Sequence, residues 1–405
     1  MKKVLILSYY FPPNAGAHVQ RIAKFVKFLP EFGYEPVILT TGNKTGRRDD
    51  ELLKDIKDIN IYYSPDYGKM IPGGIKKIFS RFFQPDKLIS WKITAIRKAL
   101  KIIGEQKIDL ILTSSPPHSM SCIASVIAER SGLPLVIDMR DEWVTFPLFG
   151  KKKYPDLNRK KYNKSLSHCK SVTTVNRTLK RRILDDLNNN NIEKPVFTVY
   201  NGFDYDDIPS GIGAVQSEKI KICYNGRFKK VSSPEFFFSF IESILTEGLL
   251  IKDDLRFICS DDMSNKKWVI KYPRTEEITE FTGYLPLKES YKIIKDCDIG
   301  LILLTDYGES SSFPLKMFDY MAQDKPIIAF VDKEDELTNV LRQYKASEIF
   351  FTNEKIDGDS MRRMTDFFKK VKNGSVSPDT ELKNKFNRRM QTKNLAEILD
   401  KSMAK

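Results

Sequence analysis

The feature that most constrains the fold is an alternation of short apolar runs with helical stripes. Near the start, residues 4–8 (VLILS) form a continuous apolar run that is typical of a buried strand. Apolar residues at helical spacing follow over residues 19–29, and residues 35–40 (EPVILT) form the next apolar run. This strand–helix–strand order predicts a parallel sheet with helices on its faces. The fold class is therefore predicted to be α/β.

The alternation occurs twice, and 405 residues are enough for two domains. It is interrupted over residues 204–217, which are rich in Asp, Gly, Pro and Ser, and a second strand series opens at residue 221. We predict an N-terminal domain of residues 1–204, a linker of 205–218, a C-terminal domain of 219–380 and a helical tail of 381–405. Two similar α/β halves make the cleft between them the expected ligand site.

Residues 310–330 combine a predicted helix start with charged side chains. Proline suits the first helical position, and the unpaired N–H groups there form an anion site. Lys316 lies in the first turn and Asp319 on the same face, so the helix offers a cation for phosphate and a carboxylate for sugar hydroxyls. The predicted donor-binding residues here are Ser311, Ser312, Phe313, Pro314, Leu315, Lys316 and Asp319.

Two more cations follow the first strand of the second half. Gly226 opens a turn after the apolar run of residues 221–225, and Arg227 and Lys230 follow it. Together with Lys316 they would place three cations near one helix start, which is more than structure requires. A bound diphosphate is the economical explanation.

The first strand–helix turn of the N-terminal half (residues 9–21) lacks the GxGxxG pattern of dinucleotide sites. Gly16 still permits a close approach of backbone to ligand, and we predict that it borders the donor. Arg21, in the following helix, is predicted to bind an anionic group of the acceptor. A merely tight turn is the structural alternative.

Polar side chains also follow later strands of this half. Asp138, Arg140 and Asp141 come at a predicted strand end, where open α/β sheets bind ligands, and His118 lies in a Pro-Pro loop after another strand. Asp138 has the structural alternative of pairing with Arg140, so Asp141 is the better functional carboxylate. Asn201 lies at the domain junction and either lines the cleft or forms a turn.

The net charge of +14 is compatible with nucleic acid, an anionic membrane surface or phosphorylated ligands. Residues 67–83 mix basic and aromatic side chains, and they form either a helix at a membrane surface or a helix packed on its own domain. Residues 151–170 are also strongly basic. No apolar run approaches the ~20 residues of a membrane span, and five scattered cysteines suggest neither disulfides nor a zinc site.

Four stretches together resemble one family: residues 9–40, the pair TSSPPHS (113–119) and VIDMRDEW (136–143), VYNGFD (199–204), and FPLKMFDYMAQDKPIIAF (313–330). They are similar to GT-B glycosyltransferases of the large retaining family 4, especially bacterial members that act in surface-polysaccharide assembly. The resemblance implies two Rossmann-like α/β/α domains facing each other across a cleft. It also implies an acceptor held by the first domain, a nucleotide sugar held by the second, and a final helix that returns to the first.

By position, the resemblance implies that Arg227 and Lys230 bind the donor diphosphate and that Asp319 binds the ribose. Ser311 stands where the family has its first acidic residue, which departs from the pattern. We predict that Asp141, His118, Lys316 and Arg227 are catalytic, and that acceptor binding involves Arg21, His118, Arg140, Asp141 and Asn201.

These expectations define a retaining, metal-independent transfer from a UDP- or GDP-linked sugar to a glycan or lipid-linked hydroxyl, with no cofactor. We expect a role in bacterial surface polysaccharide, lipopolysaccharide or capsule synthesis, in the cytoplasm and at the anionic inner face of the cell membrane. A non-catalytic nucleotide-sugar-binding or scaffold protein of the same fold is the alternative, and the Ser311 departure favours it. Nucleic-acid binding is disfavoured because the basic residues are scattered.

Overall fold

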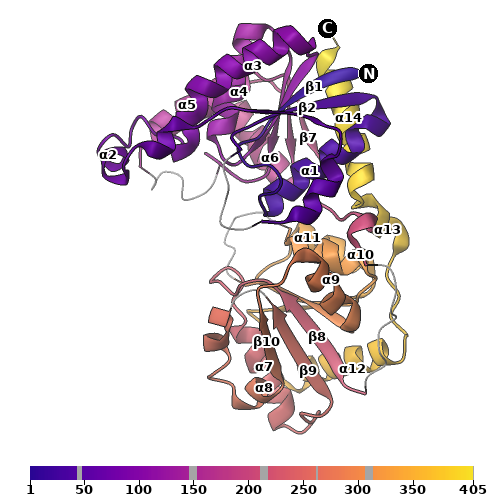
Figure 1. Ribbon diagram of the computed structural model, residues 1–405. Helices are drawn as coiled ribbons and strands as arrows, with labels where there is room; N and C mark the ends of the chain where they lie inside the picture. Colours follow the sequence, from indigo (N-terminus) through magenta and orange to yellow (C-terminus); the bar gives the residue numbers. More distant parts are fainter. Residues whose placement is uncertain (43–47, 146–152, 210–217, 261–262, 306–312, 405) are drawn as a thin grey trace. The chain divides into compact units, whose positions relative to one another are not determined.

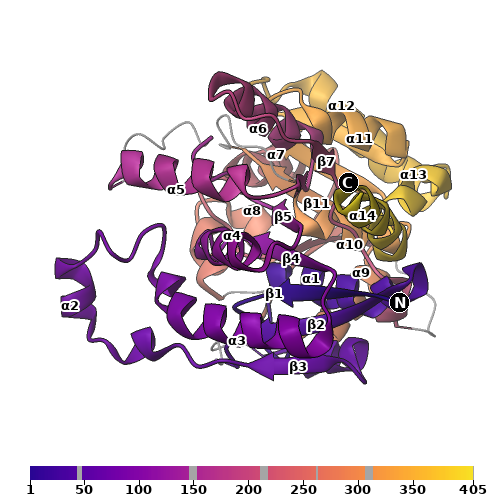
Figure 2. The ribbon, with the colours of Figure 1, turned by 90° about the horizontal axis from the view of Figure 1, so that it is seen from above.

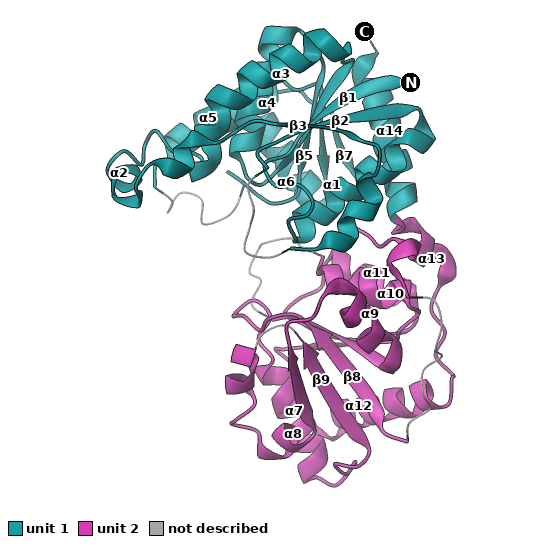
Figure 3. Cartoon of the chain, viewed as in Figure 1, with its two compact units in different colours: residues 1–201, 309–312, 388–405 teal, residues 202–308, 313–387 magenta. Residues whose placement is uncertain are grey.

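The computed structural model describes residues 1–42, 48–145, 153–209, 218–260, 263–305 and 313–404. These residues fold into two compact units (Figure 3). Unit 1 contains the described parts of 1–201 and 388–405, and unit 2 contains the described parts of 202–308 and 313–387. The division falls between Asn201 and Gly202, close to the predicted boundary after residue 204.

Unit 1 is built on a seven-stranded parallel sheet in the order β3-β2-β1-β4-β5-β6-β7 (Figure 1). The strands are β1 Lys2–Leu7, β2 Tyr34–Thr40, β3 Asn60–Tyr63, β4 Leu110–Ser115, β5 Leu135–Met139, β6 Ser171–Thr174 and β7 Val196–Thr198. The helices are α1 Ala17–Phe28, α2 Gly73–Ile78, α3 Lys92–Gln106, α4 Ser119–Ser131, α5 Pro155–Ser167, α6 Arg177–Asn189 and α14 Arg388–Met403. Short 3₁₀ helices are η1 Leu29–Phe32, η2 Asp50–Ile56, η3 Tyr67–Met70 and η4 Lys87–Trp91.

Unit 2 repeats this plan with a six-stranded parallel sheet in the order β10-β9-β8-β11-β12-β13. The strands are β8 Ile220–Asn225, β9 Leu255–Ser260, β10 Thr279–Gly283, β11 Ile299–Leu304, β12 Ile327–Val331 and β13 Ser347–Phe351. The helices are α7 Glu235–Thr246, α8 Pro273–Glu277, α9 Leu287–Asp296, α10 Leu315–Ala322, α11 Glu336–Tyr344, α12 Gly358–Lys372 and α13 Thr380–Lys385, with 3₁₀ helices η6 Tyr205–Asp207 and η7 Met263–Trp268.

The central strands are buried along their whole length because helices cover both faces of each sheet. In unit 1 one apolar layer joins the sheet to α3 and α4, and the other joins it to α1 and α14. Leu395 and Leu399 of α14 have no exposed surface in the second layer, so the end of the chain is part of unit 1 (Figure 2). The predicted tail is therefore two helices, of which α13 belongs to unit 2.

Both sheets start in the middle and grow in both directions, so the strand order reverses between β1 and β4 and between β8 and β11. The prediction of two Rossmann-like domains is confirmed by this topology. Loops at such a reversal splay apart at the carboxyl ends of the strands, where open α/β sheets bind ligands. The loops after β1 and β4 in unit 1, and the loop after β8 in unit 2, therefore position the candidate sites.

A segment of unit 1 between two aspartates leaves the body of the domain (Figures 1 and 2). Asp66 accepts hydrogen bonds from Tyr9 and Ser90 at one end, and Asp86 accepts from the backbone of Leu88 and Ser119 at the other. Between them lies α2, which has no buried residue. The interpretation of residues 67–83 as a helix packed on its own domain is wrong, because their apolar side chains are mostly exposed. No helix among the described residues is both long and apolar enough to cross a membrane.

Candidate functional site

The loop after β4 presents His118 at the start of α4. The His118 ring stacks on Trp143, with ring centroids 4.8 Å apart and an interplanar angle of 8°. Its Nδ1 atom lies 2.9 Å from the hydroxyl of Ser115. Trp143 donates in turn from its indole nitrogen to Asn158 on α5, at 3.3 Å. The ring plane of His118 is thus fixed by a stack and a hydrogen bond, which suits a group that must meet a substrate hydroxyl in one orientation.

Arg21 and Asp138 form a buried ion pair. Both side chains are fully buried, and the guanidinium donates to both carboxylate oxygens, at 2.9 and 2.8 Å. Burial alone would raise the pKa of Asp138, but the charge of Arg21 and hydrogen bonds from Arg21 and Ser114 outweigh it and hold that pKa below its usual range. The prediction that Arg21 binds the acceptor is therefore wrong, because no part of it reaches solvent.

Asn201 also serves the fold. Its side-chain oxygen accepts hydrogen bonds from Arg21, at 3.2 Å, and from Arg388 of α14, at 3.4 Å. The backbone carbonyls of Val199 and Tyr200 accept from Arg21 as well. The side-chain oxygen of Asn201 therefore has a structural role and not the predicted acceptor role. It helps to hold β7, α1 and the last helix together.

Arg140 and Asp141 follow β5 and behave differently from each other. Arg140 donates from Nε to Ser114, at 2.8 Å, and from Nη2 to the Pro116 carbonyl, so it holds the loop that carries His118. Burial lowers the pKa of Arg140 to about 10, which leaves it charged at neutral pH. Asp141 is exposed, yet desolvation by its surroundings raises the pKa of its carboxyl while Arg140 opposes the rise. Asp141 is thus placed to face an acceptor, and that role stays a prediction.

His18 is a feature that its sequence context did not reveal. Gly16, at φ 128°, begins α1, and a Cβ there would lie 3.3 Å from the His18 ring. The ring meets Tyr10 edge-on, with centroids 5.5 Å apart, and its Nε2 atom is buried without a hydrogen-bond partner among the described residues. Burial and the nearby charge of Arg140 lower the pKa of His18 to about 4. The role of Gly16 beside the donor stays a prediction.

The depressed pKa of His18 predicts how the stability of the protein depends on pH. Between pH 6.5 and about 4 an unfolded chain binds a proton at His18 while the folded chain does not, so stability falls as pH falls through this window. We expect the loss of melting temperature between pH 7 and pH 5 to be smaller in His18→Phe than in wild type. His168→Gln, which alters a surface ring near Glu129, is the control. A His18 ring that titrates near 6.5 by NMR would contradict the assignment.

In unit 2, Lys316 and Gly226 meet at the start of α10. The Lys316 ammonium lies over the Tyr224 ring, 3.4 Å from its centroid, which is a cation–π contact. Gly226 has φ 145°, and a Cβ there would lie 2.9 Å from the Lys316 Nζ atom. The sequence therefore needs glycine at 226 both for the backbone conformation and for the space that the lysine occupies. The N-cap position, Pro314, supplies no capping side chain, so the first N–H groups of α10 are open to an anion.

Asp319 lies one turn further along α10 and is oriented by Tyr291, whose hydroxyl donates to it at 2.8 Å. Asn225, at the end of β8, donates to Ser290 at 2.7 Å and accepts from Ser260 at 2.8 Å. Tyr224, Asn225 and Tyr291 are supporting residues that the sequence analysis missed. The position of the Tyr224–Asn225 pair immediately before Gly226 was the signal that could have found two of them.

The other predicted donor residues divide into four groups. Arg227 and Lys230 are exposed on the loop after β8, where a diphosphate could reach them. Phe313 is only 7% exposed and packs against Phe318, so its side chain serves the core, and donor binding by its backbone stays a prediction. Pro314 and Leu315 are half-buried at the helix start. Ser311 and Ser312 lie outside the described residues.

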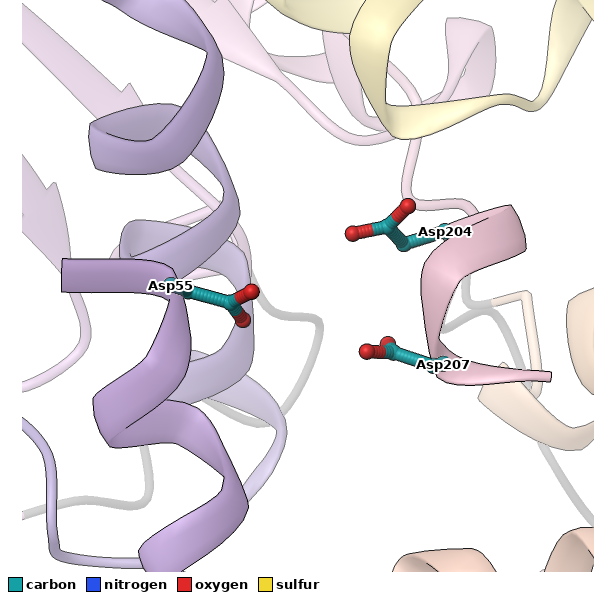
Figure 4. Close-up of side chains that lie close together, drawn as sticks. All are labelled: Asp55, Asp204 and Asp207. Carbon is teal, nitrogen blue, oxygen red and sulfur yellow. The ribbon is translucent and has the colours of Figure 1, made fainter. Parts of the chain in front are cut away.

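Three carboxylates are drawn in Figure 4, from Asp55, Asp204 and Asp207. Asp55 belongs to unit 1 and the other two belong to unit 2, so we argue no metal site from the group. Within unit 1, Asp55 pairs with Lys24 at 2.7 Å and with Lys27 at 3.4 Å. Within unit 2, Asp204 accepts from the backbone N–H of Asp206. Asp55 and Asp204 therefore each have a structural role inside their own unit.

Comparisons with known proteins agree with this geometry. Residues 19–207 match the family model of Glycosyltransferase Family 4. Similar solved structures include sucrose-phosphate synthase from Thermosynechococcus elongatus, at 10% identity over 99% of both chains with a TM-score of 0.65. They also include Anabaena Alr3699/HepE in complex with UDP, at 11% identity over 99% of this chain and 100% of that chain (TM-score 0.65), and TarM, at 11% identity over 100% and 99% (TM-score 0.67). None of the curated proteins compared with the chain matches it in sequence.

Proposed function

We propose that this chain, which has the GT-B fold and matches the model of Glycosyltransferase Family 4 over residues 19–207, transfers a sugar from a nucleoside-diphosphate sugar to a hydroxyl of a lipid-linked glycan. The predicted fold and transferase class are confirmed. The donor, the stereochemistry and the acceptor are our proposal. The family match covers the unit to which the acceptor site is assigned.

The observation that carries the proposal is the position of Lys316 in the first turn of α10, beside Gly226. An ammonium there, open N–H groups of the helix, and Arg227 and Lys230 on the adjoining loop form a site for a diphosphate. Asp319, held by Tyr291, lies one turn further along for ribose hydroxyls. The Anabaena protein of the same fold was solved in complex with UDP, which supports a nucleotide as a ligand of this fold.

We propose a retaining transfer that needs no metal ion. The acceptor oxygen bonds to the anomeric carbon on the face from which the diphosphate leaves, and the bond between that carbon and the diphosphate oxygen breaks. The acceptor proton passes to a phosphate oxygen of the leaving group. Lys316, Arg227 and the α10 N–H groups stabilise the charge that develops on the diphosphate. No protein nucleophile is required.

On the acceptor side, His118 and Asp141 are the proposed positioning groups. The stack on Trp143 and the hydrogen bond to Ser115 hold the His118 ring, while the raised pKa of Asp141 makes its carboxylate a better proton acceptor for a hydroxyl. Arg140 holds the intervening loop. The two residues would therefore orient and polarise the attacking hydroxyl.

The charge and the exposed segment favour an acceptor at an anionic membrane surface. Residues 67–85 contain four basic side chains and no acidic side chain, and they expose most of their large apolar side chains. Basic and apolar groups together are what an anionic leaflet attracts. We therefore propose a peripheral enzyme on the inner face of the cell membrane that acts in bacterial surface-polysaccharide assembly.

A thermal-shift screen against UDP-, GDP- and other nucleotide sugars tests the donor site. A donor at about 100 times its Kd should stabilise the protein by about 2.7 kcal/mol, which is roughly 5–10 °C for a domain of this size. The same samples, assayed for slow donor hydrolysis, distinguish an enzyme from a non-catalytic nucleotide-sugar-binding protein, the alternative that Ser311 favours. Stabilisation without hydrolysis or transfer would support that alternative, and no shift with any nucleotide would contradict the donor site.

A further inference from the structure

Unit 1 has a pocket of about 420 Å³ on the outer side of its helices, within the range of about 300–1,000 Å³ that is usual for ligand sites. Helix α4 contacts both α3 and α5 (Figure 2), and residues of all three helices line the pocket. Cys122, Ser125 and Val126 of α4 line it, and Phe82 and Ile93 border it from the exposed segment and the start of α3. None of these residues belongs to the donor or acceptor groups described above.

The wall of this pocket is apolar in spite of its serines. Ser125 donates to the Cys122 carbonyl at 3.0 Å, and Ser165 donates to the Lys161 carbonyl at 2.9 Å. Ser90 donates to the Asp66 carboxylate at 2.9 Å. Because each hydroxyl is satisfied within the protein, the pocket presents little that would hydrogen-bond a polar ligand. Its surface therefore suits a hydrocarbon chain.

Three lysines lie at the pocket: Lys92 at the start of α3, and Lys161 and Lys164 on α5. Lys161 donates to the Gln84 carbonyl at 2.6 Å, and Lys164 pairs at 3.6 Å with Glu129. Lys92 has no ion-pair partner among the described residues. Glu129 and the nearby carboxylate of Asp86 are two acidic groups against three cations, so the site keeps a positive charge that is complementary to a phosphate.

The pocket is continuous with the apolar surface of the exposed segment. Of the 18 large apolar side chains exposed on the described chain, seven lie within residues 67–93: Tyr67, Met70, Ile75, Ile78, Phe79, Phe82 and Ile93. Phe82 is 75% exposed and Ile93 is 82% exposed, and both also border the pocket. A chain leaving a bilayer against this surface would thus pass from lipid to pocket without crossing a polar belt.

We propose that this pocket holds part of the hydrocarbon chain of an anionic, phosphate-bearing lipid, and that this lipid carries the sugar acceptor. The inference deepens the proposed function and rests on it, because only that function makes the bound lipid the carrier of the sugar acceptor. Cys122 lies four residues beyond His118, roughly 6 Å along the α4 axis. Lys161 is linked by Gln84, Asn158 and Trp143 to the His118 ring, so this lysine connects the pocket to the predicted acceptor group. The lipid phosphate would bind there.

The test is the binding of monomeric lysophosphatidylglycerol to the full chain, below its micelle concentration, by isothermal titration calorimetry. We expect one saturable site per chain, with affinity at least 10-fold weaker in Ile93→Glu and in Val126→Phe. The first places a charge at an exposed border residue and the second fills the pocket. Ile251→Glu, at a residue 60% exposed in unit 2, is the matched control and should bind as wild type. Lysophosphatidylcholine should bind more weakly than the anionic lipid.

The same variants are floated with vesicles of phosphatidylcholine and of phosphatidylcholine with phosphatidylglycerol. We expect wild type and Ile251→Glu to float only with the anionic vesicles, and Ile93→Glu to float less. The proposal is overturned if wild type binds no lysolipid, or if Val126→Phe and Ile93→Glu bind it as wild type does. Nucleotide-sugar stabilisation measured on the same proteins separates the outcomes, because an intact donor response with no lipid binding defeats the pocket and leaves the transferase proposal standing.

Discussion

Lys316→Ala should reduce turnover by roughly 10²- to 10³-fold, the usual effect of removing one preorganised group that stabilises developing charge. It should also weaken binding of a nucleoside diphosphate by about 10- to 100-fold, because hydrogen bonds to charged groups contribute about 1.5–3 kcal/mol. The reason is its position: the ammonium sits in the first turn of α10 against Tyr224, where nothing else described in that turn carries positive charge. Initial rates and calorimetric titration with the nucleoside diphosphate measure the two effects.

Lys292→Ala is the matched control, since this α9 lysine is 55% exposed and pairs with Glu289 on the surface. It should leave both quantities nearly unchanged. Gly226→Ala tests the same site without removing the charge, because the new methyl group would meet the Lys316 ammonium and force it to move. Turnover should fall in that variant too. Near-normal donor binding in Lys316→Ala would show that this lysine does not bind the diphosphate, and it would contradict the proposed diphosphate site.

Arg21→Ala should destabilise unit 1 by about 3–5 kcal/mol, because it leaves the Asp138 carboxylate buried without its counter-charge. For a domain of this size the melting temperature should fall by roughly 6–20 °C. The variant also removes donors to the Val199 and Tyr200 carbonyls and to Asn201. Scanning calorimetry of the full chain should show one transition lowered, with the donor-stabilised transition of unit 2 retained.

An exposed ion pair of the same unit provides the comparison. Lys101 pairs at 3.6 Å with Glu105 on the surface of α3, and both side chains are more than half exposed. Lys101→Ala should change stability by no more than about 0.5 kcal/mol. Equal effects of the two substitutions would show that Arg21 is not the buried counter-ion that its contacts indicate.

The order of the helices and strands could be predicted because each central strand is a continuous apolar run. Such a run indicates a strand without any knowledge of the strands beside it. The runs at residues 4–8 and 35–40 correspond to β1 and β2, and the stripe at 19–29 corresponds to α1. Strands at the edge of a sheet are harder to predict from the sequence. Strand β10, Thr279–Gly283, is not predicted by the sequence, because it lies at the edge of its sheet and none of its residues is fully buried. Its short sequence mixes polar and apolar residues, so it lacks the continuous apolar run that is typical of a strand buried on both faces.

The candidate site was predictable where one local segment sets it and was not where distant residues combine. Lys316 and Asp319 share a helix face by spacing alone, and the structure keeps them there. Arg21 was assigned to a ligand because its partner, Asp138, lies 117 residues away and burial is not visible in the sequence. His18 illustrates the same limit, since its depressed pKa comes from packing and from Arg140 on another strand end.

The two aspartates that bound the exposed segment have a consequence for how this chain can diverge. Asp66 and Asp86 fix the ends of residues 67–85 to the domain, and Asp86 does so at the N-terminus of α4, directly after His118. Between these anchors α2 has no buried residue. The part of the segment around α2, its tip, can therefore change in sequence without disturbing the fold. If the segment binds the membrane as proposed, a graft of the tip from a relative should transfer membrane preference alone, provided that its boundaries keep both anchors.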